Sequence, residues 1–111
     1  MQKFRCTVCG YIHEGNDLPD KCPRCGALKE KFEKIPEDKA KLIDRSRLTN
    51  GLLKKLFTIL EDVEKIASTG VEDNLDPACV AIFTRAKQEA ALIRRFIRAE
   101  LEVHVNKGKW G

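Results

Sequence analysis

Two short cysteine motifs near the start of the chain constrain its fold most strongly. They are Cys-Thr-Val-Cys-Gly at residues 6–10 and Cys-Pro-Arg-Cys-Gly at residues 22–26, with twelve residues between Cys9 and Cys22. Two thiolates separated by two residues in one tight turn reach the same ion, and glycine tolerates the positive φ with which the backbone bends over the sulfurs. Two such motifs predict a tetrahedral site of four sulfurs, which is typical of zinc or iron. Its ligands are Cys6, Cys9, Cys22 and Cys25.

A module of this size depends on its metal. Residues 1–35 are rich in cysteine, glycine and turn residues. We expect two short strands around the first motif, at residues 4–6 and 11–13, with three aromatic residues covering the site. So small a domain buries too little apolar surface to fold alone, and the metal must supply part of the folding free energy. The three covering residues are Phe4, Tyr11 and Phe32.

The cysteine count and the charge exclude several classes of protein. Five cysteines are an odd number, and Cys79 stands alone, which disfavours a disulfide framework and favours a reducing, intracellular compartment. Residues 1–20 contain no long apolar run of the kind found in a secretory signal, and no segment reaches the roughly 20 apolar residues of a membrane span. A net charge of +4 is too small to indicate a nucleic-acid-binding protein. We expect a cytoplasmic protein without a membrane segment.

The rest of the chain has a helical pattern. Residues 36–48 read as a linker or a short helix, and Thr-Asn-Gly at residues 49–51 predicts an interruption, since asparagine and glycine weaken a helix interior. From residue 49 to 68 apolar residues recur at alternating spacings of four and three, and Thr69-Gly70 predicts a helix end. Asp76-Pro77 predicts the start of a second helix, over residues 77–105.

The two helices predict an antiparallel hairpin over residues 49–111, because the loop between them is short. A second apolar stripe, including Leu52, Ile59 and Ile66, needs more cover than one neighbouring helix provides. We expect two chains to pair their hairpins into a four-helix bundle, as a homodimer. The alternative is that residues 36–45 and the metal module cover the stripe within one chain.

The sequence around the cysteines resembles a rubredoxin-type domain of the rubrerythrin variety. The resemblance covers residues 4–34 and lies in Phe-Arg-Cys-Thr-Val-Cys-Gly-Tyr-Ile-His-Glu-Gly at 4–15, Cys-Pro-Arg-Cys-Gly-Ala at 22–27, and Phe32. It implies one iron held by the four cysteines, cycling between the ferric and ferrous states. It also implies one-electron transfer, usually in anaerobes or microaerophiles that cope with oxygen or peroxide. Zinc ribbons have overlapping ligand spacings, so a structural zinc site is the alternative.

The helices depart from the rubrerythrin pattern. A di-iron bundle needs Glu-x-x-His motifs, and this chain has none; the nearest pair is Glu100 and His104. In a dimer these two residues, with Glu61 or Glu64, could meet across the interface and bind a metal. The alternative is that they lie partly solvated near the helix end.

Two further features each allow two interpretations. Cys79 is interpreted as a small buried side chain or as a reactive thiol in the first turn of the second helix. A basic side around Arg94, Arg95 and Arg98 is a solvated helix face or a docking surface for an acidic redox partner.

We therefore predict an electron carrier with a redox protein as partner, and we assign no catalytic residue. The expected cofactor is one iron per chain, with zinc possible in its place. A zinc-ribbon adaptor is the second hypothesis, and a minimal rubrerythrin-like peroxide reductase with an intersubunit metal site is the third.

Overall fold

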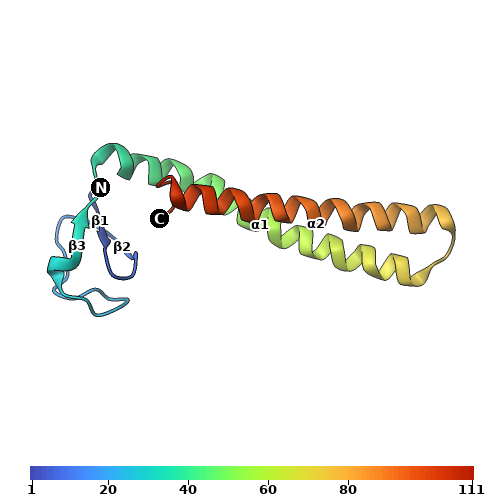
Figure 1. Ribbon diagram of the computed structural model, residues 1–111, viewed down its shortest axis with the longest axis horizontal. Helices are drawn as coiled ribbons and strands as arrows, with labels where there is room; N and C mark the ends of the chain where they lie inside the picture. Colours follow the sequence, from blue (N-terminus) through green and yellow to red (C-terminus); the bar gives the residue numbers. More distant parts are fainter. The chain divides into compact units, whose positions relative to one another are not determined.

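A small antiparallel sheet and two long helices make up the chain (Figure 1). The computed structural model describes all residues, 1–111, which divide into one unit of residues 1–47 with 107–111 and another of residues 48–106. The predicted fold class, a small cysteine-bearing β module followed by a helical hairpin, is confirmed. The elements in chain order are β1 (Lys3–Cys6), β2 (Ile12–Glu14), the 3-10 helix η1 (Lys29–Lys31), β3 (Phe32–Lys34), α1 (Glu37–Asp73) and α2 (Pro77–Asn106).

Strand β1 lies at the centre of the sheet, between β2 and β3. Phe4 pairs with His13 on one side and with Lys34 on the other, and both pairings are antiparallel. The predicted hairpin of the first two strands is confirmed. Strand β3 was not predicted, because a three-residue Phe-Glu-Lys segment has no alternating pattern of its own. Its register pairs Phe32 with Cys6, which brings an aromatic ring to the first cysteine motif.

The core of the β module is built on the cysteines themselves. Cys6, Cys22 and Phe32 are buried, and Phe4 and Tyr11 pack against them, so the predicted aromatic cover is confirmed. The rings of Tyr11 and Phe32 meet edge to face, with their centroids 6.4 Å apart. Because the core contains so few apolar side chains, the free energy from apolar burial is small, and bound metal would add substantially to it.

A buried lysine joins the sheet to the first turns of α1. The side-chain nitrogen of Lys3, a residue only 1% exposed, lies 3.0 Å from both Glu14 and Asp44, and Arg47 also pairs with Glu14. Burial lowers the pKa of Lys3, but the two carboxylates outweigh it and leave this pKa raised. Arg47 and Lys3 lower the pKa of Glu14. The pairs therefore stabilise the fold between the acidic range where Glu14 protonates and the alkaline range where Lys3 deprotonates.

Helix α1 corrects two predictions. It runs from Glu37 to Asp73 without a break, so residues 37–48 are its first turns and the interruption at residues 49–51 does not occur. Asn50 is buried in the helix and bonds to His104 of α2, so packing overrides its low helix propensity. The predicted end at Thr69-Gly70 is also wrong. Gly70 is buried, and a Cβ atom there would lie 2.3 Å from the ring of Phe83. Glycine at this position therefore allows α1 and α2 to approach each other closely and does not end α1.

Helix α2 begins where the sequence predicts. The Asp76 carboxylate accepts a hydrogen bond of 2.8 Å from the Cys79 N–H, and this bond lowers the pKa of Asp76. Asn74, with a φ of +48°, lies in the connection between the two helices. Contacts between α1 and α2 pair Asn50 with His104 and, further along, Gly70 with Phe83, which is the order of an antiparallel hairpin. Neither helix has the length and apolar content needed to cross a lipid bilayer.

Candidate metal centre

The two cysteine motifs fold into knuckles with the same hydrogen-bond pattern. In the first, the Gly10 N–H donates to the Cys6 carbonyl at 2.9 Å, and the Cys6 N–H donates to the Tyr11 carbonyl at 2.8 Å. Gly10 has a φ of +80°, which side chains with a Cβ atom rarely adopt. The local sequence therefore determines each turn. The second knuckle repeats both bonds with Gly26, Cys22 and Ala27.

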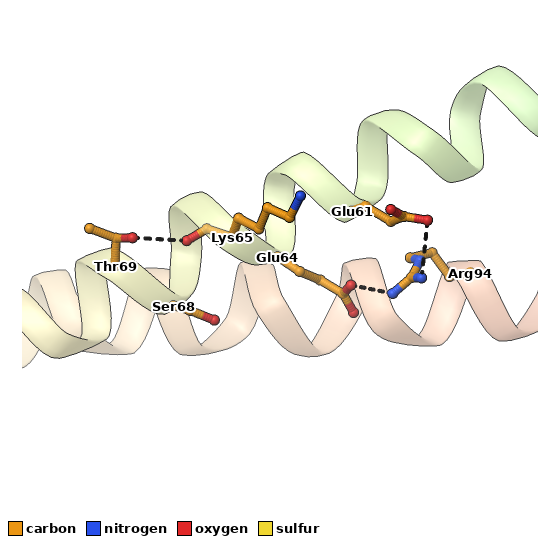
Figure 2. A pocket seen from close by; sticks show the side chains of 6 residues that line it. All are labelled: Glu61, Glu64, Lys65, Ser68, Thr69 and Arg94. Carbon is orange, nitrogen blue, oxygen red and sulfur yellow. Dashed lines mark hydrogen bonds and ion pairs between the residues drawn. The ribbon is translucent and has the colours of Figure 1, made fainter.

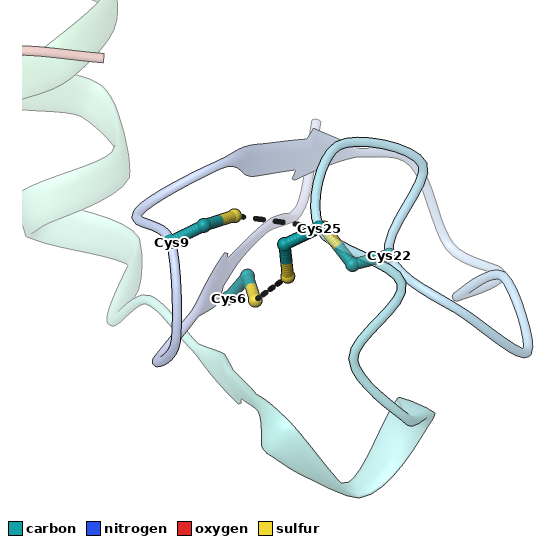
Figure 3. Close-up of side chains that lie close together, drawn as sticks. All are labelled: Cys6, Cys9, Cys22 and Cys25. Atoms are coloured by element: carbon teal, nitrogen blue, oxygen red, sulfur yellow. Dashed lines mark hydrogen bonds between the residues drawn. The ribbon is translucent and has the colours of Figure 1, made fainter.

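The knuckles bring all four predicted ligands together (Figure 3). The four Sγ atoms lie within 4.8 Å of one another, and the cysteines form no disulfide. Cys6 and Cys25 are 3.7 Å apart at their sulfurs, and so are Cys9 and Cys22, so each close pair joins one knuckle to the other. Thiolates bound to a central ion at about 2.3 Å form a tetrahedron with edges of about 3.8 Å. The donor set therefore fits a tetrahedral metal ion and forms a possible metal site.

A backbone N–H group in each knuckle lowers the pKa of one cysteine thiol. The Tyr11 N–H, assisted by the Arg24 side chain, lowers the pKa of Cys9 to about 6. The Ala27 N–H lowers the pKa of Cys25 in the same way, but desolvation and the neighbouring thiols raise it to about 12. The two shifts therefore have different causes. Closely spaced thiolates also repel one another and cannot all ionise without a cation between them.

The cysteines differ in their exposure. Cys6 and Cys22, the first residues of their motifs, are buried, whereas Cys9 is half-buried and Cys25 is exposed. The site therefore has an inner side closed by the aromatic core and an outer side at the surface, next to the second cysteine of each motif.

The structure does not support a second metal site at Glu100 and His104. His104 is only 7% exposed, so the expectation that it lies partly solvated is wrong. Its Nδ1 lies 2.5 Å from Asn50 Oδ1, and its Nε2 lies 3.1 Å from Glu100 Oε1. Both ring nitrogens are engaged within the chain, so neither has a lone pair directed at an ion.

Glu61 and Glu64, the other candidates for that site, are paired with an arginine (Figure 2). Both carboxylates contact the guanidinium of Arg94 on the opposite helix, and the same guanidinium lies 4.5 Å above the ring of Phe57. Arg98 also lies over this ring. Arg94, one residue of the predicted basic side, is therefore paired inside the hairpin. An open pocket of about 490 Å³ is lined by Glu61, Glu64, Lys65, Ser68, Thr69 and Arg94.

Cys79 lies outside the cysteine cluster, at the start of α2. It is half-buried rather than buried, and its Sγ lies 3.5 Å from Asp76 Oδ2. The thiol therefore belongs to the helix cap and not to the apolar seam.

We expect Asn50→Ala to destabilise the helical hairpin by about 1–3 kcal/mol, because it leaves the buried His104 Nδ1 without a partner. Chemical denaturation followed by circular dichroism measures the free energy of unfolding. The control is the double variant Asn50→Leu/His104→Leu, which replaces both polar groups and should recover most of the loss. An Asn50→Ala variant as stable as the wild type would contradict the role of this bond.

Comparison with known proteins agrees with this geometry. Residues 4–33 match the family described as the rubrerythrin, rubredoxin-like domain. Reverse rubrerythrin-1 of Clostridium acetobutylicum is 33% identical over 82 residues, which cover 74% of this chain and 40% of that protein. The chain thus spans less than half of this relative. The alignment is nevertheless longer than the rubredoxin-like domain and extends into the helices.

Other relatives match a smaller share of the chain. The rubredoxin of Peptoniphilus asaccharolyticus is 47% identical over 49 residues, covering 30% of this chain and 92% of that protein. The rubrerythrin of Nitratidesulfovibrio vulgaris is 52% identical over 31 residues, covering 28% of this chain and 16% of its own. No solved structure matches the chain significantly. These matches show that the chain belongs to the rubredoxin family and that residues 4–33 are a rubredoxin-like domain of the rubrerythrin type.

Proposed function

We propose that this chain is a one-electron transfer protein with a single iron held by Cys6, Cys9, Cys22 and Cys25. The observation that carries the proposal is the set of four sulfurs, with its two 3.7 Å pairs across the knuckles. The similarity to rubredoxins supports iron over zinc. A bound iron supplies a one-electron couple between the ferric and ferrous states.

The protein groups hold the cage in one shape. Each knuckle is fixed by its own backbone hydrogen bonds, so the thiolates need not move when the charge of the site changes. The N–H groups of Tyr11 and Ala27 donate to the sulfurs of Cys9 and Cys25, and such bonds favour the more negative, reduced state. The aromatic core keeps water from the inner side, and exposed Cys25 keeps the path to a partner short.

The proposal includes two partners, a protein that donates or accepts the electron and a second copy of this chain. Its proposed physiological setting is anaerobic oxidative-stress defence or redox metabolism, with any catalysis in the partner. We propose that residues 1–35 are the redox module, that residues 36–48 connect it, and that residues 49–111 are the assembly part. The connecting segment is helical, since α1 begins at Glu37.

The test is the metal content and colour of protein made under anaerobic, iron-supplemented conditions. We expect one iron per chain, a red ferric form that bleaches on reduction, and one electron taken up per chain in a reductive titration. The zinc-loaded protein is the colourless control. Stoichiometric zinc despite excess iron would overturn the proposal in favour of the zinc-ribbon adaptor, and more than one iron per chain would favour the peroxide reductase.

A further inference from the structure

The helical unit of residues 48–106 leaves a regular set of large apolar side chains exposed. On each helix they recur at spacings that follow the helical repeat, so they form a stripe along α1 and another along α2. Isolated exposed apolar residues are common, whereas two such rows on neighbouring helices are not. The members are Leu52, Leu56, Ile59 and Ile66 on α1, and Ile82, Ile93, Phe96 and Val103 on α2.

The two stripes lie on the same side of the hairpin. Each stripe residue directly precedes a residue of the inner seam between the helices: Ile66 precedes buried Ala67, and Phe96 precedes buried Ile97. Successive residues are rotated by about 100° around a helix axis. On both helices the stripe is therefore displaced from the seam in the same rotational sense. Because the helices are antiparallel, the same sense of rotation places both stripes on one side. We call this side the apolar face.

The opposite side of the hairpin is polar. There the residues that follow seam positions are mostly charged or hydroxylic, such as Glu61 and Ser68 on α1 and Arg95 and Arg98 on α2. Figure 2 shows part of this side, where the Glu61 and Glu64 carboxylates meet Arg94. The apolar surface of the hairpin is therefore concentrated on one side.

Two acidic residues beside the α2 stripe are already paired. Glu89 lies 3.1 Å from Arg85, and Glu100 lies 3.1 Å from His104. A twofold axis brings identical surfaces together, so an unpaired charge near the axis would meet its own copy and repel it. The exposed area of the eight stripe residues is comparable to the ~800 Å² that one partner contributes to a stable protein interface.

We infer that the apolar face packs against the same face of a second copy, so that two hairpins form one four-helix bundle. The pairing of Glu89 and Glu100 within α2 and the exposed apolar area favour an identical partner over an acidic or basic one. The inference rests on the proposed pairing of two copies but not on the metal.

The first experiment changes the apolar face in the full-length, metal-loaded protein. We expect the wild type to sediment at twice the 12.6 kDa mass of the chain at tens of micromolar, and Ile59→Glu/Phe96→Glu to sediment as a monomer. Val105→Glu is the matched control, because Val105 is 55% exposed against 60% for Phe96 but follows His104 and lies on the other side. A monomeric wild type, a dimeric double variant, or a control that dissociates equally would overturn the inference.

The second experiment needs no variant. If folding and pairing are linked, the Tm of the helical unit rises with the concentration of the wild-type protein. A Tm that stays constant over a hundredfold range of concentration would overturn the inference even if the double variant fails to fold. Iron content and colour are measured on the same samples, so a loss of pairing with iron retained is distinguished from a failure of the proposed redox function.

Discussion

Replacing Cys22 with alanine is expected to remove the metal and unfold the small sheet, while the helical hairpin keeps its helical content. Binding by four protein ligands contributes about 10–16 kcal/mol in small structural zinc sites. The loss of one ligand therefore weakens binding by roughly 100- to 1,000-fold. The effect on folding is large because Cys22 is also a buried core residue beside Phe32.

The metal bound per chain after dialysis against a chelator measures this effect, and the dispersion of amide signals in NMR spectra reports the fold of residues 1–35. Cys79→Ala is the matched control, because this cysteine lies outside the cluster, and its metal content should equal that of the wild type. Full metal retention in Cys22→Ala, or its loss in Cys79→Ala, would refute the assignment of the four ligands.

Two glycine-to-alanine changes in the same helix are expected to have opposite effects. A Cβ atom at Gly70 would lie 2.3 Å from the ring of Phe83, so Gly70→Ala forces α1 and α2 apart and should cost about 1–3 kcal/mol. Gly51 has no such neighbour within 4 Å, and Gly51→Ala should stabilise the helix by about 0.5–1 kcal/mol.

Thermal and chemical unfolding, followed by circular dichroism at one protein concentration, measure both changes. A double-mutant cycle identifies the cause, because the cost of Gly70→Ala should largely disappear when Phe83 is also alanine. Equal effects at Gly51 and Gly70, or a full cost that persists without the Phe83 ring, would show that close packing is not the reason for glycine at position 70.

The candidate site could be predicted from the sequence almost completely. Its cysteines come in pairs separated by two residues, and Gly10 and Gly26 follow them, so each knuckle is decided by local chain geometry. The start of α2 was equally predictable, because Asp76 caps a helix whose first residue is proline. Features that depend only on residues adjacent in the sequence can be predicted from short sequence segments.

The wrong predictions about α1 concern residues whose roles depend on contacts with distant parts of the sequence. Asn50 and Gly70 look like helix breakers, yet one bonds to His104 and the other makes room for Phe83, and both partners lie on the other helix. Lys3 looks like an ordinary surface lysine until the fold brings Glu14 and Asp44 to it. Such roles depend on residues distant in the sequence.

The sequence by itself determined the four cysteines of the candidate site, the two knuckles and the presence of two amphipathic helices, because local spacing decides these features. Tertiary structure decided that α1 is continuous, that His104 and Glu64 are engaged inside the hairpin, and that the exposed apolar residues of both helices share one side. The physical reason is that a contact between the helices depends on how two distant segments are rotated against each other, and only the packed hairpin defines that rotation.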